Sequence, residues 1–405
     1  MVKTLQNENV FYGKDSLKTL TKIIERESAT NILLISGKKS FKTSGLESKL
    51  QTLLCDKNLT IVNNFEINPK YEEILLIGGK LKHQEIDLII AAGGGSVIDF
   101  AKCINLYLSS WTDDGADGII DKELLPNKLF PLIAIPTTAG TGSEATHFAV
   151  VYIKGIKVSV AHESLVPTYA IIDPSLTYGS PPYVSACCAF DALCQAIESF
   201  WSIGATPESQ KYAKEAIILI KNNMVKAINL DCIESRNKLS KGAYLAGKAI
   251  NISKTSAPHA LSYSITSTFS IPHGHAVALT LGYFFEINEL NDHQIKVSKG
   301  TSVVQLKNNI SEIKYLLGWS NKNFLIEWGR LMTECGLYTN IKIDREPKFF
   351  LFFFLLVSPF HLFAYIDPSS GGALITAILG FFAAIVYSVR KFFYNLRSKF
   401  RKNKD

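Results

Sequence analysis

The sequence has few of the features that stabilise proteins outside the cell. It contains seven cysteines among 405 residues, an odd number, and no CxxC pair. Such cysteines are typical of thiols in a reducing cytosol rather than of a disulfide scaffold. The first residues, MVKTLQNENVFYG, also lack the apolar core of a secretory signal peptide. We therefore expect the body of the protein to lie in the cytoplasm.

The sequence also lacks an excess of charge of one sign over most of its length. It has 43 Lys and Arg against 36 Asp and Glu, a net charge of +7. Seven basic residues and one acidic residue fall in positions 390–405, which leaves 36 basic and 35 acidic residues before them. A nearly neutral body argues against nucleic-acid binding. At 47% hydrophobic and 20% charged, the chain is not of the disordered class, and its length predicts two or three domains.

The C-terminal end differs from the rest in its long apolar runs. Residues 349–405 hold 12 of the 24 phenylalanines, and the runs 349–366 and 371–389 are each about long enough to span a bilayer core. A turn-forming stretch at 367–370 separates them. The sequence therefore predicts a C-terminal membrane helical hairpin that anchors the cytoplasmic body and keeps the basic tail on the same side. Buried helices of a soluble domain are the alternative.

Short apolar runs alternate with amphipathic ones in the first 180 residues. The runs 31–36, 59–65, 87–92 and 132–135 predict buried strands, and 71–82 predicts a helix. Buried strands that alternate with helices are typical of a parallel α/β sheet.

After about residue 180 the pattern becomes helical. Helices are predicted at 182–202, 209–229, 235–252 and 257–268. A segment rich in Gly and Pro at 178–182 marks the boundary. The predicted organisation is an α/β domain at 1–180, an all-helical domain at 181–345 and the C-terminal segment at 346–405.

Two loops rich in small residues follow predicted strands. Gly93, Gly94 and Gly95 lie between a strand and a helix, where the backbone can approach a phosphate at the helix N-terminus. The loop 136–144 (PTTAGTGSE) combines glycines with hydroxyl side chains. Two such loops on one sheet predict a dinucleotide site, although neither is GxGxxG, and tight strand–helix turns are the structural alternative. The predicted side-chain donors are Ser96, Thr137, Thr138, Thr141 and Ser143.

The helical part contains a candidate metal site. Asp191 and Gln195 are four residues apart and would share one face of a helix. His259 and His273 lie fourteen residues apart, the first on an apolar helix and the second in a Pro-His-Gly turn. Oxygen ligands with two imidazoles suit a divalent metal, although each histidine is more often a core residue. Two further residues are candidates for proton transfer or for a structural role: Tyr263 and His275.

In their order and spacing these motifs resemble the iron-dependent (group III) alcohol dehydrogenase family. The resemblance extends from about residue 8 to 345 and includes GGGSVID at 93–99, PTTAGTGSE at 136–144 and the Pro-His-Gly turn at 272–274. It implies an α/β dinucleotide-binding domain followed by an all-α metal-binding domain (a dehydroquinate synthase-like fold). It also implies NADPH or NADH, a divalent metal (Fe²⁺, with Zn²⁺ as the alternative), and a homodimer or larger assembly.

The resemblance also implies roles for single residues. The family binds its metal with one Asp and three His, which Asp191, His259 and His273 match, while Gln195 stands where a histidine is usual. The motifs around Gln195 and Tyr263 are most similar to the phosphonoacetaldehyde reductase branch, which makes 2-hydroxyethylphosphonate. This similarity implies an aldehyde substrate that carries a phosphonate, and we expect Lys254 to bind that group. A general alcohol or lactaldehyde dehydrogenase and an inactive, membrane-tethered nucleotide-binding remnant are the alternatives.

The choice of cofactor is implied in the same way. Gly37 lies where many NAD-preferring relatives have an aspartate, and Lys38 adds positive charge, so NADPH should be tolerated or preferred. Asp99 and Lys157 match family positions near the cofactor. The family continues with further helices beyond the region of Leu337, whereas this chain passes into its apolar segment. We therefore expect a truncated helical domain and a fusion, either natural or caused by a frameshift.

Overall fold

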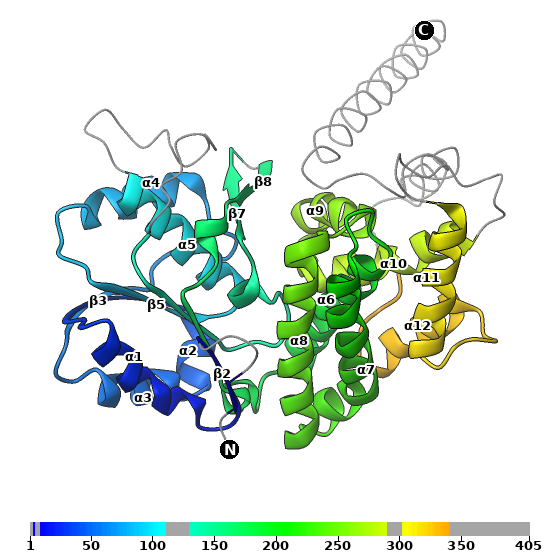
Figure 1. Cartoon of the computed structure of the whole chain (residues 1–405), viewed down its shortest axis with the longest axis horizontal. Helices are drawn as coiled ribbons and strands as arrows, with labels where there is room; N and C mark the ends of the chain where they lie inside the picture. The colour runs from blue at the N-terminus through cyan, green and yellow to red at the C-terminus, as the bar shows by residue number, and fades with distance from the viewer. Residues whose placement is uncertain (1–2, 5–8, 111–128, 155, 290–301, 341–405) are drawn as a thin grey trace, which may run out of the picture.

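The structure is a computed structural model that describes residues 3–4, 9–110, 129–154, 156–289 and 302–340. In this part of the chain an α/β domain and a helical domain lie side by side (Figure 1). The predicted membrane hairpin at 349–389 and the basic residues after it lie outside the described residues. Among the helices described, none combines the length and the apolar composition needed to cross a bilayer.

The first domain is built on a sheet whose strands run in the order β1-β2-β9-β6-β5-β3-β4. All of its neighbouring strands are parallel except β1, which is antiparallel to β2. The predicted parallel sheet is thus confirmed, although the second predicted strand ends at Val62 because two turn-forming asparagines follow it. The strands are β1 (Lys3–Thr4), β2 (Val10–Tyr12), β3 (Asn31–Ser36), β4 (Asn58–Val62), β5 (Leu88–Gly93), β6 (Leu132–Pro136) and β9 (Tyr169–Ile172).

Helices cover both faces of this sheet, because its central strands are apolar on both sides. Leu33 and Ile35 of β3 pack into one core cluster, whereas Ile32 and Leu34 pack into another. In Figure 1 the helices α1–α3 lie below the sheet and α4 and α5 lie above it. Their bounds are α1 (Leu20–Arg26), α2 (Lys39–Thr43), α3 (Leu46–Leu53), α4 (Tyr71–Leu81) and α5 (Gly95–Ser110).

The strand order places both predicted cofactor loops at one edge of the sheet. After β3 the chain moves to β4 on one side, and β5 then pairs with the other side of β3. In parallel sheets a ligand binds at the carboxyl ends of the strands where the order reverses in this way. Gly37 follows β3 and Gly93 ends β5, and the Gly37 amide donates to the Ala92 carbonyl at 3.2 Å. The topology therefore brings these glycines to the expected binding edge.

A β-hairpin that was not predicted from the sequence projects from the α/β domain beside the helical domain (Figure 1). It consists of β7 (Phe148–Ile153) and β8 (Ile156–Ala161), which pair in antiparallel register with Tyr152 opposite Lys157. Ala149 and Val151 are fully buried in the core of the α/β domain. Because side chains alternate along a strand, Tyr152 and its neighbour Lys157 lie on the opposite face of the hairpin.

The second domain is helical, and the four predicted helices are confirmed with both ends within two residues. Its central helix, α6, is buried along almost its whole length, as expected for a helix with apolar residues on all sides. Helices α7, α8 and α10 pack around it (Figure 1). The helices are α6 (Pro182–Trp201), α7 (Pro207–Asn229), α8 (Ile233–Ser253), α9 (Ala257–Phe269), α10 (His273–Glu289), α11 (Val303–Leu316) and α12 (Phe324–Glu334).

The two domains are in close contact at a pair of glycines. Gly142 of the 136–144 loop has φ 61° and lies against Gly247 of α8. A Cβ atom on Gly247 would lie 2.5 Å from the Gly142 carbonyl oxygen, closer than real Cβ contacts allow. Only the absence of a side chain therefore lets the loop rest on α8.

We predict that Gly247→Ala destabilises the protein. The added methyl group has no space, and overpacking of this kind costs about 1–3 kcal/mol. The thermal unfolding midpoint should therefore fall. Gly329→Ala is the matched control, since its Cβ would lie 3.7 Å from the nearest atom, and alanine in a helix should then stabilise by up to about 1 kcal/mol. A Gly247→Ala variant that melts at or above the wild type would contradict this view of the interface.

Candidate metal centre and cofactor loops

Helices α6, α9 and α10 position the predicted metal ligands. Asp191 and Gln195 lie one turn apart on α6 and are each 4% exposed, while His259 lies in the first turn of α9. His273 begins α10, and the next residue, Gly274, lies against the Cys187 carbonyl and the Asp191 Cβ atom with no room for a side chain. This glycine lets the start of α10 rest directly on α6.

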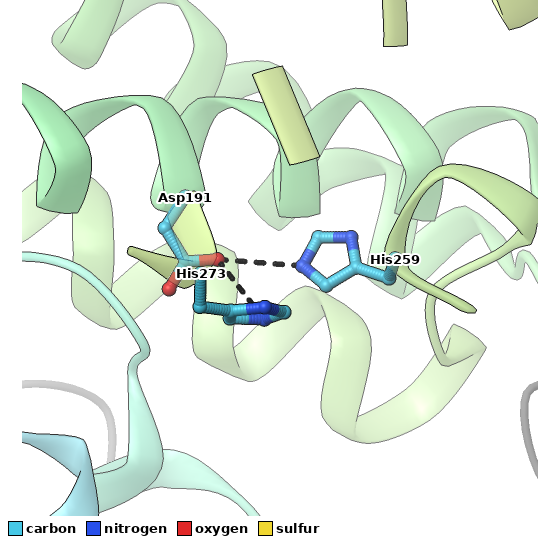
Figure 2. Close-up of side chains that lie close together, drawn as sticks. All are labelled: Asp191, His259 and His273. Carbon is cyan, nitrogen blue, oxygen red and sulfur yellow. Dashed lines mark ion pairs between the residues drawn. The ribbon is translucent and has the colours of Figure 1, made fainter. Parts of the chain in front are cut away.

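Asp191, His259 and His273 converge in the helical domain (Figure 2). The Asp191 Oδ1 atom lies 3.4 Å from His259 Nε2 and 3.8 Å from His273 Nε2. One ligand atom from each of the three residues lies within 4.8 Å of the others. Residues 68 and 82 positions from Asp191 in the chain thus meet as the sequence had predicted.

A fourth residue, Glu198, orients His259 from behind. It lies two turns after Asp191 on α6 and is 0% exposed. Its Oε1 lies 2.5 Å from His259 Nδ1, and its Oε2 accepts hydrogen bonds from the Ser256 amide at 2.7 Å and hydroxyl at 2.9 Å. Because a carboxylate only accepts, His259 Nδ1 carries a proton, which leaves Nε2, the nitrogen that faces Asp191, as the one available to a metal.

His273 is oriented by a hydroxyl group. Ser262 Oγ donates to the His259 carbonyl at 2.6 Å and lies 3.1 Å from His273 Nδ1. The serine proton is already used, so His273 Nδ1 donates to Ser262 and its Nε2 also presents a lone pair toward Asp191.

The residues present fit a divalent cation. Among the described residues, the buried atoms Asp191 Oδ1, Gln195 Oε1 and His259 Nε2 have no hydrogen-bond partner. Burial would raise the pKa of Asp191, but His259 and His273 outweigh burial and lower it. Burial likewise lowers the pKa of His259, but Glu198 and Asp191 outweigh it and raise this pKa to about 9. The facing Asp191 and His259 atoms require a positive charge between them: without a metal, the raised pKa of His259 lets a proton on Nε2 supply it, and a divalent metal would displace that proton.

The glycine loop after β5 leaves the backbone open at the predicted binding edge. A Cβ on Gly93 would overlap Val97, and a Cβ on Gly95 would lie 2.6 Å from Thr141. Gly94 lies opposite Thr138, whose Oγ1 would be 3.3 Å from such a Cβ. The start of the sixteen-residue helix α5 therefore meets the 136–144 loop at close range, and the phosphate-binding role of this turn stays a prediction.

Two of the predicted cofactor residues belong to a buried network. Asp99 accepts hydrogen bonds from the Ser143 hydroxyl and, at 3.1 Å, from the Val150 amide. Lys102, 0% exposed, donates to the carbonyls of Ser143 at 2.8 Å and Thr146 at 2.7 Å. The network attaches the 136–144 loop to α5. Asp99 and Ser143 therefore have a structural role in holding this loop, and they also remain candidates for cofactor contact.

The other predicted cofactor residues lie around the same edge. The Thr137 hydroxyl is buried without a partner among the described residues, and the Thr141 carbonyl accepts a hydrogen bond from Gln195 Nε2 at 3.2 Å. Ser96 Oγ accepts from the Asn68 amide at 3.3 Å, and Lys38 Nζ donates to Asn64 Oδ1 at 3.1 Å. The bond from Gln195 joins the metal helix directly to the cofactor loop.

Two candidate residues lie beside the cluster. The Tyr263 ring centre is 5.8 Å from that of His273, and Lys157 Nζ lies 3.5 Å from the Tyr263 ring centre. Burial raises the pKa of Tyr263, so its hydroxyl remains protonated. Lys157 comes from the α/β domain and Tyr263 from the helical domain.

His275 is held by contacts with other residues, and Lys254 lies at the end of α8. His275 has both ring nitrogens occupied, with Nδ1 3.0 Å from the Tyr183 hydroxyl and Nε2 2.8 Å from the Tyr338 carbonyl. Lys254 is the exposed C-cap residue of α8, with φ 63° and ψ 176°. Residues other than glycine are strained there, and such strain often marks functional segments. The predicted roles of both residues remain predictions.

Sequence reasoning had missed Glu198 and Lys102, although each carries a signal. Glu198 follows Asp191 by seven residues and Gln195 by three, so all three share one face of an otherwise apolar helix. Lys102 follows Asp99 by three residues on α5. A polar residue repeated at helical spacing within a buried helix indicates a polar network.

Comparisons with known proteins agree on one family. Residues 7–174 match the model for iron-containing alcohol dehydrogenase, and residues 185–322 match the C-terminal model of the Fe-containing alcohol dehydrogenase family. Long-chain-alcohol dehydrogenase 1 of Geobacillus thermodenitrificans is 34% identical over 278 residues, 67% of this chain and 69% of the relative. The NADPH-dependent butanol dehydrogenase of Clostridium saccharobutylicum is 28% identical over 319 residues, 77% of this chain and 80% of the relative.

Solved structures give the same result for the fold. The sulfoacetaldehyde reductase of Bifidobacterium kashiwanohense in complex with NAD⁺ matches with a TM-score of 0.75 and 28% identity, covering 91% of this chain and 94% of that one. The iron-containing alcohol dehydrogenase of Thermotoga maritima matches with a TM-score of 0.75 and 27% identity, covering 94% and 100%. The predicted two-domain fold is therefore confirmed.

Replacement of Gln195 tests whether this residue is a ligand. We predict that Gln195→His tightens binding of Fe²⁺ or Zn²⁺, because imidazole is a stronger ligand than a neutral amide oxygen. Gln195→Met, which keeps the length but removes the oxygen, should weaken it. Competition with a chelator measures both dissociation constants. If neither variant shifts metal affinity, Gln195 is not a ligand.

Replacement of Glu198 tests the support of His259. We predict that Glu198→Gln lowers metal affinity about 10- to 100-fold, the usual effect of losing a partner of a ligating histidine. The same chelator competition measures it. Glu312→Gln, which removes an exposed partner of Lys214, is the control and should leave affinity unchanged. A Glu198→Gln protein with wild-type affinity would show that the Glu198 contact does not support the metal site.

Proposed function

The chain belongs to the iron-containing alcohol dehydrogenase family, an oxidoreductase family that uses NAD(P) and iron, and on that premise we propose that it reduces phosphonoacetaldehyde to 2-hydroxyethylphosphonate. In this reaction a hydride and a proton are added across the aldehyde C=O bond. The dehydrogenase activity follows from the family, whereas the phosphonate is our proposal.

The chain's own residues divide the work between the two domains. Asp191, His259, His273 and Gln195 would hold the divalent metal, with Glu198 fixing His259. When bound, the metal would polarise the carbonyl oxygen and the reduced nicotinamide would supply the hydride. The 93–95 turn and the 136–144 loop would hold the cofactor at the binding edge of the sheet.

We propose Tyr263, rather than His275, as the residue that takes part in proton transfer. Its ring lies beside His273, and burial keeps its hydroxyl protonated. His275 instead has both nitrogens bonded to Tyr183 and Tyr338. A role for His275 in proton transfer would require one of these bonds to open.

The positive charge beside the metal cluster is the observation that supports an anionic substrate. Lys157 lies next to Tyr263, and the resemblance adds Lys254 at the strained end of α8. The Bifidobacterium kashiwanohense protein is a sulfoacetaldehyde reductase. Its substrate, like phosphonoacetaldehyde, is a two-carbon aldehyde with a tetrahedral oxyanion. The same site chemistry would suit both compounds.

A second candidate function, that of a general alcohol dehydrogenase, is supported at least as well by the names of the relatives. The relatives named above act, by their names, on long-chain alcohols and on butanol, and neither compound carries an anionic group. Gly37 and the adjacent positive charge favour NADPH in either case, because nothing at that position repels a 2′-phosphate.

Competition between substrates decides between these functions. We predict that the purified full-length protein, loaded with Fe²⁺, oxidises NADPH with phosphonoacetaldehyde at a kcat/KM at least about tenfold above that for propanal or lactaldehyde, as expected for one added charge-assisted contact. Equal values, or higher values for the neutral aldehydes, would favour the general alcohol dehydrogenase. Cofactor binding without aldehyde-dependent oxidation would favour the inactive remnant.

A further inference from the structure

Gln195 connects the helix that carries the candidate metal ligands to the predicted cofactor loop. It lies on α6, one turn after Asp191, and is 4% exposed. Its Nε2 atom donates a hydrogen bond to the Thr141 carbonyl at 3.2 Å. Since Thr141 belongs to the 136–144 loop of the α/β domain, this bond crosses from one domain to the other.

The two ends of the Gln195 amide differ in what they can bind. The Thr141 carbonyl only accepts, so the atom bonded to it is the Nε2 donor and the other end is Oε1. Oε1 is buried, and the described residues offer it no hydrogen-bond partner. Such a buried acceptor is unfavourable. A divalent cation held by Asp191, His259 and His273 would give it a partner.

Thr141 also contacts the glycine turn after β5. A Cβ on Gly95 would lie 2.6 Å from the Thr141 side chain, so the two loops touch directly. The next residue, Gly142, rests on Gly247 of α8. The placement of Thr141 therefore affects the predicted phosphate turn as well as its own loop.

We propose that Gln195 couples occupation of the metal site to binding of the cofactor. A cation at Oε1 would fix the orientation of the amide and polarise it, which makes Nε2–H a stronger donor to the Thr141 carbonyl. Gln195 is thus a positioning residue for the loop. Because a coupling free energy is reciprocal, the cofactor should raise metal affinity by the same factor as the metal raises cofactor affinity.

Binding measurements on the full-length protein test this coupling without turnover. We expect Zn²⁺, used as the metal probe, to lower the dissociation constant for NADPH about five- to tenfold, the effect of strengthening one hydrogen bond. NADPH fluorescence measures this constant with and without the metal. NADPH should lower the dissociation constant for Zn²⁺, measured by chelator competition, by the same factor. A factor of one in either experiment overturns the proposal.

Gln195→Glu separates the two ends of the amide. A carboxylate binds Zn²⁺ but cannot donate to the Thr141 carbonyl, so Zn²⁺ affinity should be kept or increased while its effect on NADPH is lost. Gln195→His should keep the coupling, because imidazole can bind a metal through one nitrogen and donate through the other. If Gln195→Glu folds only with metal, its NADPH dissociation constant in the Zn²⁺ form should still exceed that of the wild type about five- to tenfold. An unchanged constant there contradicts the proposal.

Glu198→Gln is the matched control. In the described part of the chain, the Glu198 carboxylate bonds to Ser256 and His259 and not to the loop. The variant should therefore weaken metal binding but keep the wild-type coupling factor at saturating Zn²⁺. If Gln195→Glu lowers NADPH affinity equally with and without Zn²⁺, Gln195 only packs against the loop, and the proposal is overturned. Because no aldehyde is present, each outcome is independent of the substrate preference that tests the proposed function.

Discussion

The arrangement of the helical domain depends on buried negative charge on α6. Asp191 and Glu198 are carboxylates 4% and 0% exposed, and burying a carboxylate is unfavourable unless charge or hydrogen bonds compensate it. Glu198 is compensated by Ser256 and His259. Asp191 instead faces the Nε2 atoms of His259 and His273. The packing of α6, α9 and α10 is therefore complete only with a cation, which couples metal binding to stability.

The same helix also determines where the two domains meet. Gln195 on α6 donates to the Thr141 carbonyl of the cofactor loop, and Gly142 of that loop rests on Gly247 of α8. The loop is fixed from the other side by Lys102 of α5. Because the loop contacts both domains, direct packing holds the predicted cofactor loop against the helix that carries Asp191 and Gln195.

Much of this arrangement could be predicted from local patterns. The strand 31–36 and the helices from residue 182 onward follow from apolar periodicity, and the Asp191 face follows from helical spacing. The hairpin 148–161 was not predicted, although the run FAVVYI at 148–153 is rich in the β-branched and aromatic residues typical of a strand. The contact of Lys157 with Tyr263 could not be predicted, since no spacing along the chain encodes the meeting of two domains.

The two departures from the family pattern have one electrostatic consequence. Gln195 and Tyr263 both stand where the resemblance implies a histidine in many relatives, so two groups that can acquire positive charge are replaced by neutral ones. A protonated imidazole at position 263 would repel the ammonium of Lys157. A tyrosine instead presents the negative face of its ring, which attracts a cation at 3.5 Å. Tyr263 therefore makes it favourable for Lys157 to lie close to the metal cluster.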